Sequence, residues 1–560
     1  MDYKTGISGL AMLLLAEGIV SAQSLAEVRV ILKYKSPVSV SLSSPQQASQ
    51  LFKLPVKSLT PVAGDAWLLK LQPKDSDDLY TNSAYDLDTV LQQLRNNPLV
   101  SYAVPDRVGH FKPMPSATAP ENDILLSHKV QWDEFKAPGG IMLESEAGLR
   151  DGAWAYTTGM SSPATVVAVL DTGISLNDSL AGSLVQDANG KVFGWNFAAN
   201  NKDISDETDS WHGTHVAGTI AAFGDIMLGV GEHMKILPVK IPDKSGMFYE
   251  SQVINAIYWS VGGTVPGVPV NPWPAKVINM SFGVDKGPGK EIEHCDEALL
   301  DAISFARQSG AVIMVAAGND NRWEHYNAPG ACNGTVRVAA TGPTGLRAPY
   351  SNYGPSVSFA APGGDLRQGK KGGILSTVNP GGGYKRSGFD FYQGTSMASP
   401  HAAGVAGLVY AVSEGAISPE RVEQILYATS HAFGKSHDSN NSCVGNKPCG
   451  HGILDAANAV KAAMARYDVI ITAPLAHELM QATCAKGEYR FKLAGSTTES
   501  VRWSLPQVSC PKQVNYQHPE LKQSSDGSII AYYGSTQLVM DSSNFRQCQI
   551  IGSHGVGCYY

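Results

Sequence analysis

From about residue 150 onward, apolar runs alternate with segments of helical periodicity, and this alternation constrains the fold more than any other feature of the chain. The runs are five or six residues long and lie at 166–170, 235–240, 276–280 and 312–317. A helical pattern precedes the last run at 298–306, where apolar residues recur three and four positions apart. Continuous apolar runs are typical of strands covered on both faces, so the sequence predicts an α/β fold in which helices flank a parallel sheet.

Polar residues with catalytic potential lie at the ends of these elements, where ligands bind in sheets of this kind. Asp171 ends the first run, and Asn319 closely follows the last. His212 and Ser396 each open a segment of small apolar residues that is typical of a buried helix, whose N-terminus can stabilise negative charge. Each residue alone would more often be a cap or a structural group, so the prediction of a catalytic site depends on their occurring together.

The order Asp171, His212, Ser396 and the motifs around these residues resemble the subtilisin-like serine peptidases. The motifs are Asp-Thr-Gly at 171–173, His-Gly-Thr-His-Val-Ala-Gly-Thr at 212–219, Ala-Ala-Gly-Asn at 316–319 and Gly-Thr-Ser-Met-Ala-Ser-Pro-His at 394–401. This chain order is the known order of the triad in subtilisin. The resemblance covers about residues 150–465 and implies a subtilisin-like catalytic domain over 121–465.

The resemblance also implies a role for each site residue. His212 would act as the base that activates Ser396, and Asp171 would orient and stabilise His212. The Asn319 side chain and the Ser396 backbone N–H would stabilise the oxyanion. The residues expected to bind substrate, mainly through backbone groups, are Ser281, Phe282, Gly283, Ala316 and Gly318.

No cofactor is expected for the chemistry, but a structural calcium ion is common in the family. The loop that usually supplies its ligands is shortened here, at 223–227. An acidic loop before His212 offers an alternative set of oxygen ligands, although a solvated loop explains the same residues. The carboxylates of this loop are Asp203, Asp206, Glu207 and Asp209. His215 lies one turn beyond His212 and is expected to pack rather than bind metal, because no third ligand is evident; His401 is likewise expected to be structural.

Residues 1–22 are typical of a secretory signal. Lys4 precedes an apolar run at 10–16, and the small residues at 20–22 suit cleavage after Ala22. The run is too short to span a bilayer. We therefore expect a secreted protein, extracellular or in the periplasm or at the cell surface, without a transmembrane segment.

Residues 23–120 are predicted to form a small α+β unit followed by a Pro-rich linker at 112–120. Strands are expected at 28–34, 66–71 and 100–104, and a helix at 87–94. The unit resembles the inhibitory prosegment of the secreted bacterial members of the family. By that resemblance it would assist folding, block the cleft with its C-terminal strand and be cut off in or before the linker.

Residues 466–560 change character and predict a small antiparallel β domain, with alternating patterns at 489–493 and 501–505 and β-like runs at 529–533 and 538–540. All eight cysteines lie from Cys295 onward, which suits disulfides in an exported protein. Cys443 and Cys449 enclose a short loop and are expected to pair, leaving Cys295 to Cys332. The remaining four allow three connectivities among Cys484, Cys510, Cys548 and Cys558.

The sequence therefore predicts an exported, self-processing serine endopeptidase that acts on proteins and peptides, with its own prosegment as an intramolecular inhibitor. The formal net charge is −7, and no basic run suggests a nucleic-acid partner. Two other functions remain open: a pseudoprotease that binds peptide strands without cutting them, and an adhesion protein whose active part is the β domain.

Overall fold

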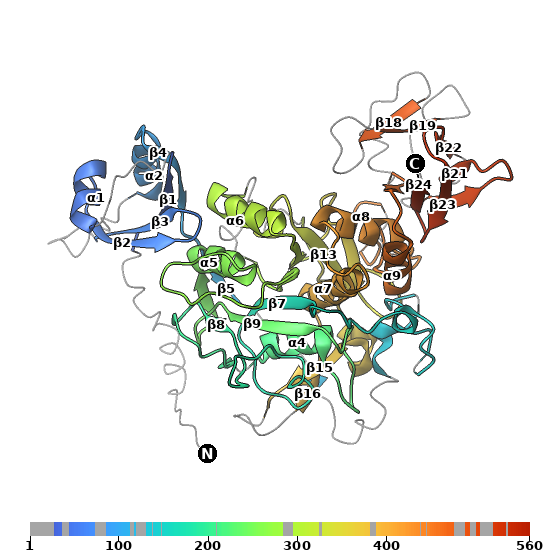
Figure 1. The fold of residues 1–560 in the computed structure, drawn as a ribbon, viewed down its shortest axis with the longest axis horizontal. Coiled ribbons are helices and arrows are strands. Elements are labelled where there is room, and N and C mark those ends of the chain that lie inside the picture. Colours follow the sequence, from blue (N-terminus) through green and yellow to red (C-terminus); the bar gives the residue numbers. More distant parts are fainter. Residues whose placement is uncertain are drawn as a thin grey trace, which may run out of the picture. The chain divides into compact units, whose positions relative to one another are not determined.

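The computed structural model forms two compact units, of which the first comprises residues up to 61 and 65–106, and the second residues 62–64 and 107–560 (Figure 1). The residues that the structure describes are 27–35, 44–72, 86–111, 117–118, 130–136, 138–146, 148–208, 210–283, 295–323, 328–380, 388–436, 438, 440–443, 445–474, 488–492, 500–504, 519–533 and 536–559. The expected signal at 1–22 lies outside these residues.

The first unit is a four-stranded antiparallel sheet in the order β2-β3-β1-β4, packed against two helices. Strand β1 pairs with both β3 and β4, so the strand expected at the start of the unit is its centre. The elements are β1 (Arg29–Tyr34), α1 (Pro45–Phe52), β2 (Val56–Val62), β3 (Ala66–Leu71), α2 (Leu87–Arg95) and β4 (Val100–Pro105). An ion pair between Arg29 and Asp106, with 2.6 Å between Nη2 and Oδ2, ties β1 to the end of the unit.

The second unit is built on a seven-stranded sheet in the order β14-β13-β12-β11-β7-β9-β8. All neighbouring pairs in it are parallel, which confirms the predicted fold class. The strands are β7 (Val166–Asp171), β8 (Trp195–Asn196), β9 (Lys235–Lys240), β11 (Val277–Met280), β12 (Val312–Ala316), β13 (Val336–Thr341) and β14 (Phe359–Pro362). β7 and β11 pair near the middle of the sheet, so each has a neighbouring strand on both sides at its C-terminal end.

Helices cover both faces of this sheet, as its continuous apolar strands require. α4 (His212–Ala221) packs with α7 (Thr395–Val412) on one face, and α5 (Glu250–Ser260) packs with α6 (Glu297–Gln308) on the other (Figure 1). α8 (Pro419–Thr429) and α9 (Ala456–Ala465) pack beside α7. Every residue of α4 is buried, as are all residues of α7 up to Ala411, so these two helices hold their first residues rigidly.

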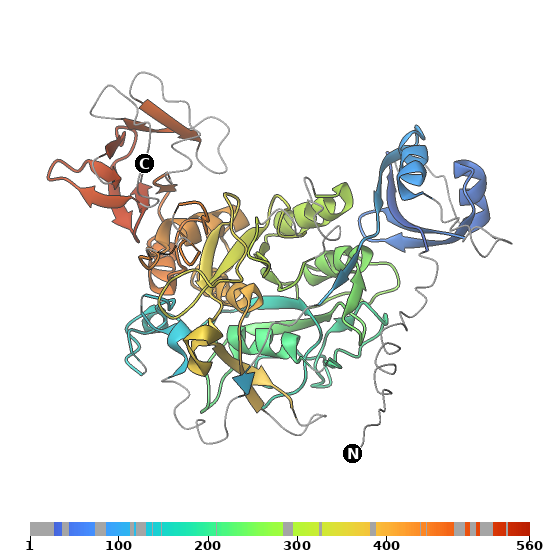
Figure 2. The same ribbon diagram turned by 180° about the vertical axis from the view of Figure 1, so that it is seen from behind.

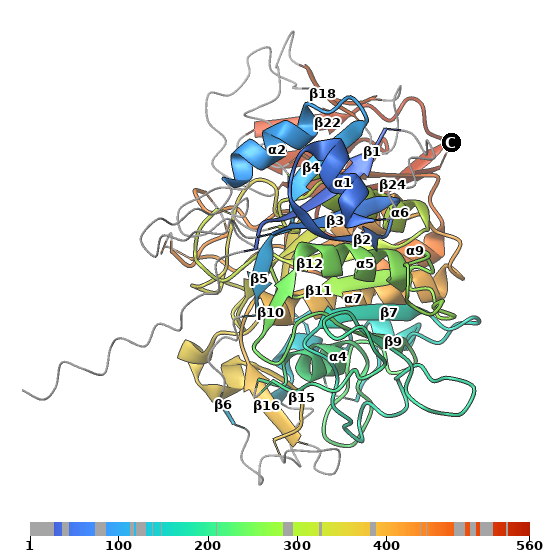
Figure 3. The same cartoon turned by 90° about the vertical axis from the view of Figure 1, so that its left-hand side faces the viewer.

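Two smaller sheets lie beside the main one. β5 (Val108–His110) pairs antiparallel with β10 (Met247–Tyr249), as Figure 3 shows. β6 (Ala117–Thr118) pairs antiparallel with β16 (Gly388–Tyr392), which also pairs with β15 (Ile374–Val378). Among the described residues, no helix combines the length and the apolar character needed to cross a membrane.

The C-terminal region contains two antiparallel sheets with an apolar cluster of their own (Figure 2). The strands are β17 (Val469–Thr472), β18 (Glu488–Lys492), β19 (Ser500–Ser504), β20 (Glu520–Gln523), β21 (Ile529–Tyr533), β22 (Thr536–Met540), β23 (Gln547–Ile551) and β24 (Gly555–Tyr559). The predicted disulfides Cys295–Cys332 and Cys443–Cys449 are confirmed, and Cys548 pairs with Cys558. Cys484 and Cys510 lie outside the described residues.

Candidate active site

A buried carboxylate and a buried imidazole meet at the C-terminal end of β7. The Nδ1–H of His212 donates to Oδ1 of Asp171 over 2.8 Å, and the side chains are only 8% and 1% exposed. The backbone N–H of Thr172 donates to the same oxygen over 2.7 Å. A carboxylate that accepts at Nδ1 leaves Nε2 as the ring nitrogen that can take a proton, so this pair has the geometry of an oriented general base.

Packing at the start of α4 explains why His212 is held against Asp171. A Cβ at the next residue, Gly213, would lie 2.2 Å from the carbonyl oxygen of Gly173, so only glycine allows the helix to approach this closely. The backbone N–H of Gly213 also donates to the hydroxyl of Thr172 over 2.9 Å. The helix therefore starts directly on the loop that follows β7.

The charge around His212 favours its protonated form. Burial lowers the pKa of His212, but the charge and hydrogen bond of Asp171, with a further contribution from the charge of Asp206, outweigh burial and raise the pKa above its ordinary 6.5. The carboxylates of Asp171 and Asp206 thus stabilise the imidazolium that forms when Nε2 of His212 takes a proton.

Ser396 lies in the first turn of α7, one residue after Thr395 and 9% exposed. Its hydroxyl donates to the backbone carbonyl of Ser281 over 3.0 Å, while the hydroxyl of Ser281 donates to the carbonyl of Ser396 over 2.9 Å. The chain after β11 and the start of α7 are therefore joined by a reciprocal pair of bonds.

Asn319 lies beside the same helix start. Its Oδ1 accepts from the backbone N–H of Thr395 over 2.8 Å and from the Thr395 hydroxyl over 2.9 Å. Asn352 holds the loop that carries it, since its Nδ2 donates to Ala317 O over 3.0 Å and its Oδ1 accepts from the N–H of Asp320. With the amide oxygen committed to Thr395, the Asn319 amide nitrogen is the end that can donate to a bound group.

Three phenylalanine rings form a cluster next to His212. The ring of Phe111 lies with its centroid 5.1 Å from that of Phe282, 5.5 Å from that of Phe248 and 5.8 Å from the His212 ring. The backbone N–H of Phe111 donates to Gly246 O over 2.9 Å, continuing the pairing of β5 with β10. Residues 108–111 therefore lie along β10 as an added strand. Since Phe282 follows Ser281, the same contacts bring the His212 and Ser396 sides together.

The residues expected to bind substrate lie at the ends of two neighbouring strands. Ser281, Phe282 and Gly283 directly follow β11, and Ala316 ends the adjacent β12. Gly318 has a positive φ of 104°, and its N–H donates to the hydroxyl of Thr395 over 3.0 Å. Ser281 and Gly318 are thus bonded directly to the first residues of α7.

The two other histidines of the motifs are packed inside the protein. His215 stacks on Tyr392 with 4.1 Å between ring centroids, and its Nε2 lies 3.1 Å from the carbonyl oxygen of Ile374. Burial, with the charge of His212, lowers the pKa of His215 to about 3. Nδ1 of His401 lies 2.7 Å from Met397 O, and its Nε2 lies 3.0 Å from Asp133 Oδ2.

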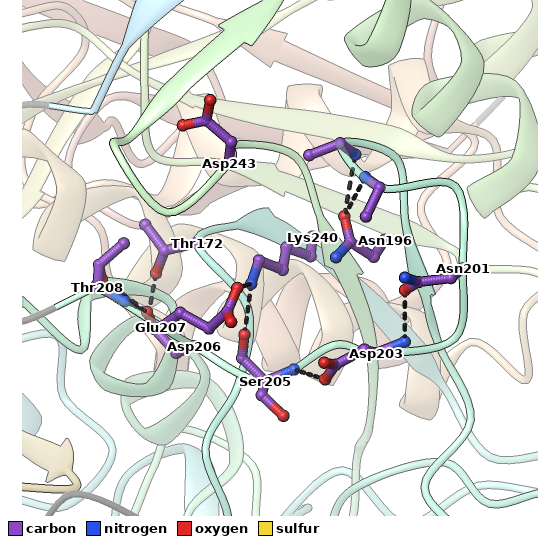
Figure 4. A network of polar contacts seen from close by, with 12 residues as sticks. Thr172, Asn196, Asn201, Asp203, Ser205, Asp206, Glu207, Thr208, Lys240 and Asp243 are labelled. Carbon is purple, nitrogen blue, oxygen red and sulfur yellow. Dashed lines mark hydrogen bonds and ion pairs between the residues drawn. The ribbon is translucent and has the colours of Figure 1, made fainter.

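The described carboxylates of the acidic loop before His212 are bonded to protein groups rather than arranged as metal ligands. Figure 4 shows its carboxylates engaged with protein groups: Oδ2 of Asp206 accepts from the Thr172 hydroxyl over 2.7 Å, and Glu207 Oε2 lies 2.8 Å from Nζ of Lys240. The Lys240 ammonium is buried and also donates to Ser205 O over 2.7 Å.

Of the other two acidic residues of the loop, the structure describes one. Asp203 caps the N–H of Ser205 over 3.1 Å, and Asp209 lies outside the described residues. Within the described part of the chain, no group of three histidine, cysteine or acidic residues converges as metal ligands. In its described part the loop binds the Lys240 ammonium, and the calcium ion that the sequence allowed here is not shown.

Sequence reasoning did not assign functions to Phe111, Phe248, Asn279 or Thr395. Thr395 lies inside the motif at 394–401, and Asn279 is a polar residue inside the apolar run at 276–280, so the sequence offered a signal for both. Phe111 and Phe248 had no such signal, because their importance comes from a contact between segments far apart in the chain.

Comparison with known proteins identifies one family. The sequence model described as the subtilase family matches residues 162–452. An extracellular protease of Xanthomonas campestris pv. campestris is 33% identical over 498 residues, which cover 82% of this chain and 78% of that protein. An extracellular basic protease of Dichelobacter nodosus is 33% identical over 412 residues, 67% of this chain and 60% of that protein.

Solved structures agree with this result. A protease from Pseudoalteromonas arctica is 37% identical with a TM-score of 0.51, and the match covers 60% of this chain and 97% of that one. Fervidolysin from Fervidobacterium pennivorans has a TM-score of 0.54 at 21% identity, covering 81% of this chain and 64% of that one, and supports the fold alone.

Proposed function

The chain belongs to the subtilase family and is a subtilisin-like serine endopeptidase, and from that premise we propose that Asp171, His212 and Ser396 form its catalytic triad. The observation that carries the proposal is the buried 2.8 Å bond from His212 Nδ1 to Asp171 at the end of β7. It leaves Nε2 of His212 as the proton acceptor. Ser396 is bonded to Ser281, whose neighbour Phe282 packs on Phe111, and the Phe111 ring in turn contacts the His212 ring.

The proposed reaction uses two acyl-transfer steps. Ser396 Oγ attacks the peptide carbonyl carbon while His212 Nε2 takes the hydroxyl proton, and the resulting imidazolium gives that proton to the leaving amine as the C–N bond breaks. Water then attacks the acyl-enzyme with the same base and releases the carboxylic acid and the Ser396 hydroxyl. Asp171 stays ionised throughout and stabilises the imidazolium, which agrees with the raised pKa of His212. The steps need only protein groups.

The oxyanion formed in each step requires donors already in place. We assign this role to the amide nitrogen of Asn319 and the backbone N–H of Ser396. The assignment is supported by the two bonds that Thr395 donates to the Asn319 oxygen, since they turn the amide so that its nitrogen is available.

The substrate is proposed to bind as an extended strand between two edges. One edge is β10, and the other is formed by Ser281, Phe282 and Gly283; Ala316 and Gly318 line the neighbouring pocket. The chain's own β5 and Phe111 already adopt such a strand on β10. Binding through main-chain groups leaves selectivity to side-chain pockets, and the rings of Phe248 and Phe282 favour an apolar or aromatic substrate residue.

The enzyme is proposed to be made as a zymogen, with residues 23–120 as the inhibitory segment. Residues 107–111 occupy the substrate edge, and Arg107 anchors them through Glu250, 3.5 Å away, and Asp296, 3.1 Å away. β6 pairs with β16, the strand that leads into α7. These two attachments bracket the segment between Phe111 and Ala117, so we propose that self-processing cuts a bond there.

Export of the enzyme is proposed from independent observations. The two relatives named above are described as extracellular proteases, residues 1–22 have the pattern of a secretory signal, and disulfides are typical of oxidising compartments.

Expression of the full chain with and without Ser396→Ala tests the proposed function. The unsubstituted chain should process itself and hydrolyse casein, and Ser396→Ala should remain full length and inactive. Ser413→Ala, which removes a hydroxyl just past the other end of α7, is the matched control and should behave as the unsubstituted chain. A folded, unsubstituted precursor that neither matures nor cuts casein would favour a peptide-binding or adhesion protein. Processing by Ser396→Ala would show that Ser396 is not the nucleophile.

The cut site is tested on the same samples. Mass spectrometry of the earliest processed product should give a new N-terminus at one of residues 112–117. A first cut outside this interval contradicts the proposed bracketing, whatever the activity.

A further inference from the structure

The backbone carbonyl of Ser396 lacks the partner that a helix normally provides. In a regular α-helix it would accept a hydrogen bond from the N–H of the residue four positions later, which here is Pro400, inside α7. Proline has no N–H, and its ring crowds the carbonyl four residues before it. The surroundings of this carbonyl are largely buried, since Pro400 is buried and Ser396 is 9% exposed. The carbonyl of the nucleophile therefore needs a donor from elsewhere.

Ser281 supplies that donor from outside the helix. Its hydroxyl lies 2.9 Å from the Ser396 carbonyl oxygen, and its side chain is buried. Nδ2 of Asn279 donates to the Ser281 oxygen over 3.0 Å, and the hydroxyl of Ser399 donates to Oδ1 of Asn279 over 2.7 Å. Because a hydroxyl has one proton, a donor on its oxygen directs that proton to the carbonyl. The three side chains form a chain of bonds with one direction.

We propose that the Ser281 hydroxyl is a positioning group for the nucleophile, replacing the helical hydrogen bond that Pro400 removes, and that Asn279 and Ser399 fix its direction. The bond from the Ser281 hydroxyl fixes the orientation of the peptide group between Ser396 and Met397. It thereby fixes the backbone conformation of Ser396 and the direction in which its Oγ points. The inference rests on the proposed role of Ser396 as nucleophile. It concerns the Ser281 side chain, whereas the proposed contact with substrate uses residues 281–283 as a strand edge.

A second substitution distinguishes positioning from general structural support. Pro400→Ala returns an N–H to position 400, where it can donate to the Ser396 carbonyl as in any helix. If the Ser281 hydroxyl acts by replacing that bond, it becomes largely dispensable once the bond is restored. A purely structural role, such as filling space after β11, would not depend on residue 400.

The experiment is a double-mutant cycle on the full chain, with kcat and KM for a chromogenic peptide and the rate of self-processing as readouts. Since small misplacements of a reacting group are costly, Ser281→Ala should lower kcat by about tenfold to a hundredfold and change KM by less than about twofold. In the Pro400→Ala background, the same substitution should lower kcat by less than about threefold.

Ser260→Ala is the matched control, because the hydroxyl of Ser260 is also buried and donates to a helix carbonyl, that of Ala256, over 2.7 Å. It should leave kcat unchanged. The proposal is overturned if Ser281→Ala leaves kcat unchanged, changes only KM, or lowers kcat equally with and without Pro400→Ala.

If Ser281→Ala yields no folded precursor, Ser399→Ala gives the same test, since it removes only the far end of the chain of bonds. Its smaller loss of kcat should likewise shrink in the Pro400→Ala background, and an equal loss in both backgrounds refutes the proposal. Activity that survives Ser396→Ala would refute the proposed nucleophile instead, so the two failures are distinguishable.

Discussion

Gly213→Ala tests how closely the start of α4 must approach the loop after β7. A Cβ at position 213 would lie 2.2 Å from the carbonyl oxygen of Gly173 and 3.1 Å from the Cβ of Asp171. Real Cβ atoms essentially never come closer than 3.0 Å, so the helix start and the loop must separate by about 0.8 Å. Alanine would by itself stabilise a helix interior by about 0.5–1 kcal/mol, so two effects oppose each other.

The displacement should outweigh the gain in helix propensity. A shift of about 1 Å at a catalytic group can cost about a hundredfold in rate, which corresponds to about 2.7 kcal/mol of transition-state stabilisation. We therefore expect Gly213→Ala to lower kcat by about a hundredfold, with a change in KM below about threefold, because the substituted residue adjoins His212 and not the substrate edges.

Initial rates on a chromogenic peptide, with gel analysis of self-processing, measure this loss. Gly182→Ala is the control, since a Cβ there meets no atom within 4 Å, and it should leave both readouts unchanged. A folded Gly213→Ala enzyme with kcat within about twofold of the unsubstituted enzyme would refute the close contact between α4 and the loop after β7.

Three further predictions follow from buried groups and close contacts. Asp206→Asn removes a negative charge that raises the pKa of His212. Because activity requires neutral His212, the acid limb of the profile of kcat/KM against pH should move to lower pH. An acid limb at the same pH would contradict the stated influence of this charge. Lys240→Met leaves the backbone carbonyl of Ser205 without its ammonium donor. In urea titrations of the Ser396→Ala precursor, it should lower the free energy of unfolding by about 1–3 kcal/mol. Added calcium should not restore this loss. Gly555→Val would place a Cβ 2.5 Å from the Cβ of Ala428, so limited proteolysis should detect a loosened C-terminal region while peptide hydrolysis is retained; unchanged proteolysis would contradict that contact.

The parts of the fold that could be predicted are those in which consecutive residues are apolar because all of them are buried. The strands β7, β9, β11 and β12 read as apolar runs because both faces of the sheet are covered. β13 was not predicted, because Arg337 interrupts its apolar pattern. The guanidinium of Arg337 is buried and donates to Ser356 O and to Cys332 O, each over 3.0 Å, which no local pattern reveals.

Helix α1 was also missed, although its start is signalled in the sequence. It is short and mostly polar, with only Ala48 and Phe52 buried, so its apolar periodicity is weak. Ser44 caps it by accepting from the Gln47 N–H, and Pro45 occupies its first turn. Capping residues would have located this helix where periodicity could not.

The candidate catalytic residues were predicted from motifs, but the side chains that surround them were not. Asp171, His212 and Ser396 belong to short sequences that are recognisable one at a time. The rings of Phe111 and Phe248 next to His212 come from segments more than a hundred residues apart, and only the fold brings them together. Motifs therefore predict the candidate catalytic residues, whereas tertiary contacts determine which side chains surround them.

Local sequence rules fail at the two helix starts that hold His212 and Ser396, the proposed base and nucleophile. Trp211, the residue before His212, has a left-handed φ of 48°, a conformation that costs a bulky residue of order 1–3 kcal/mol. Pro400 lies inside α7, where it removes the bond that would fix the Ser396 carbonyl. Such violations persist only where surrounding contacts over-determine them. At the start of α4 the contact is the bond from the Gly213 N–H to the Thr172 hydroxyl over 2.9 Å, and at the start of α7 it is the bond from the Ser281 hydroxyl to the Ser396 carbonyl over 2.9 Å. Tertiary hydrogen bonds therefore hold the starts of the two helices that carry the proposed base and nucleophile, which explains why helix propensity carries so little information about this site.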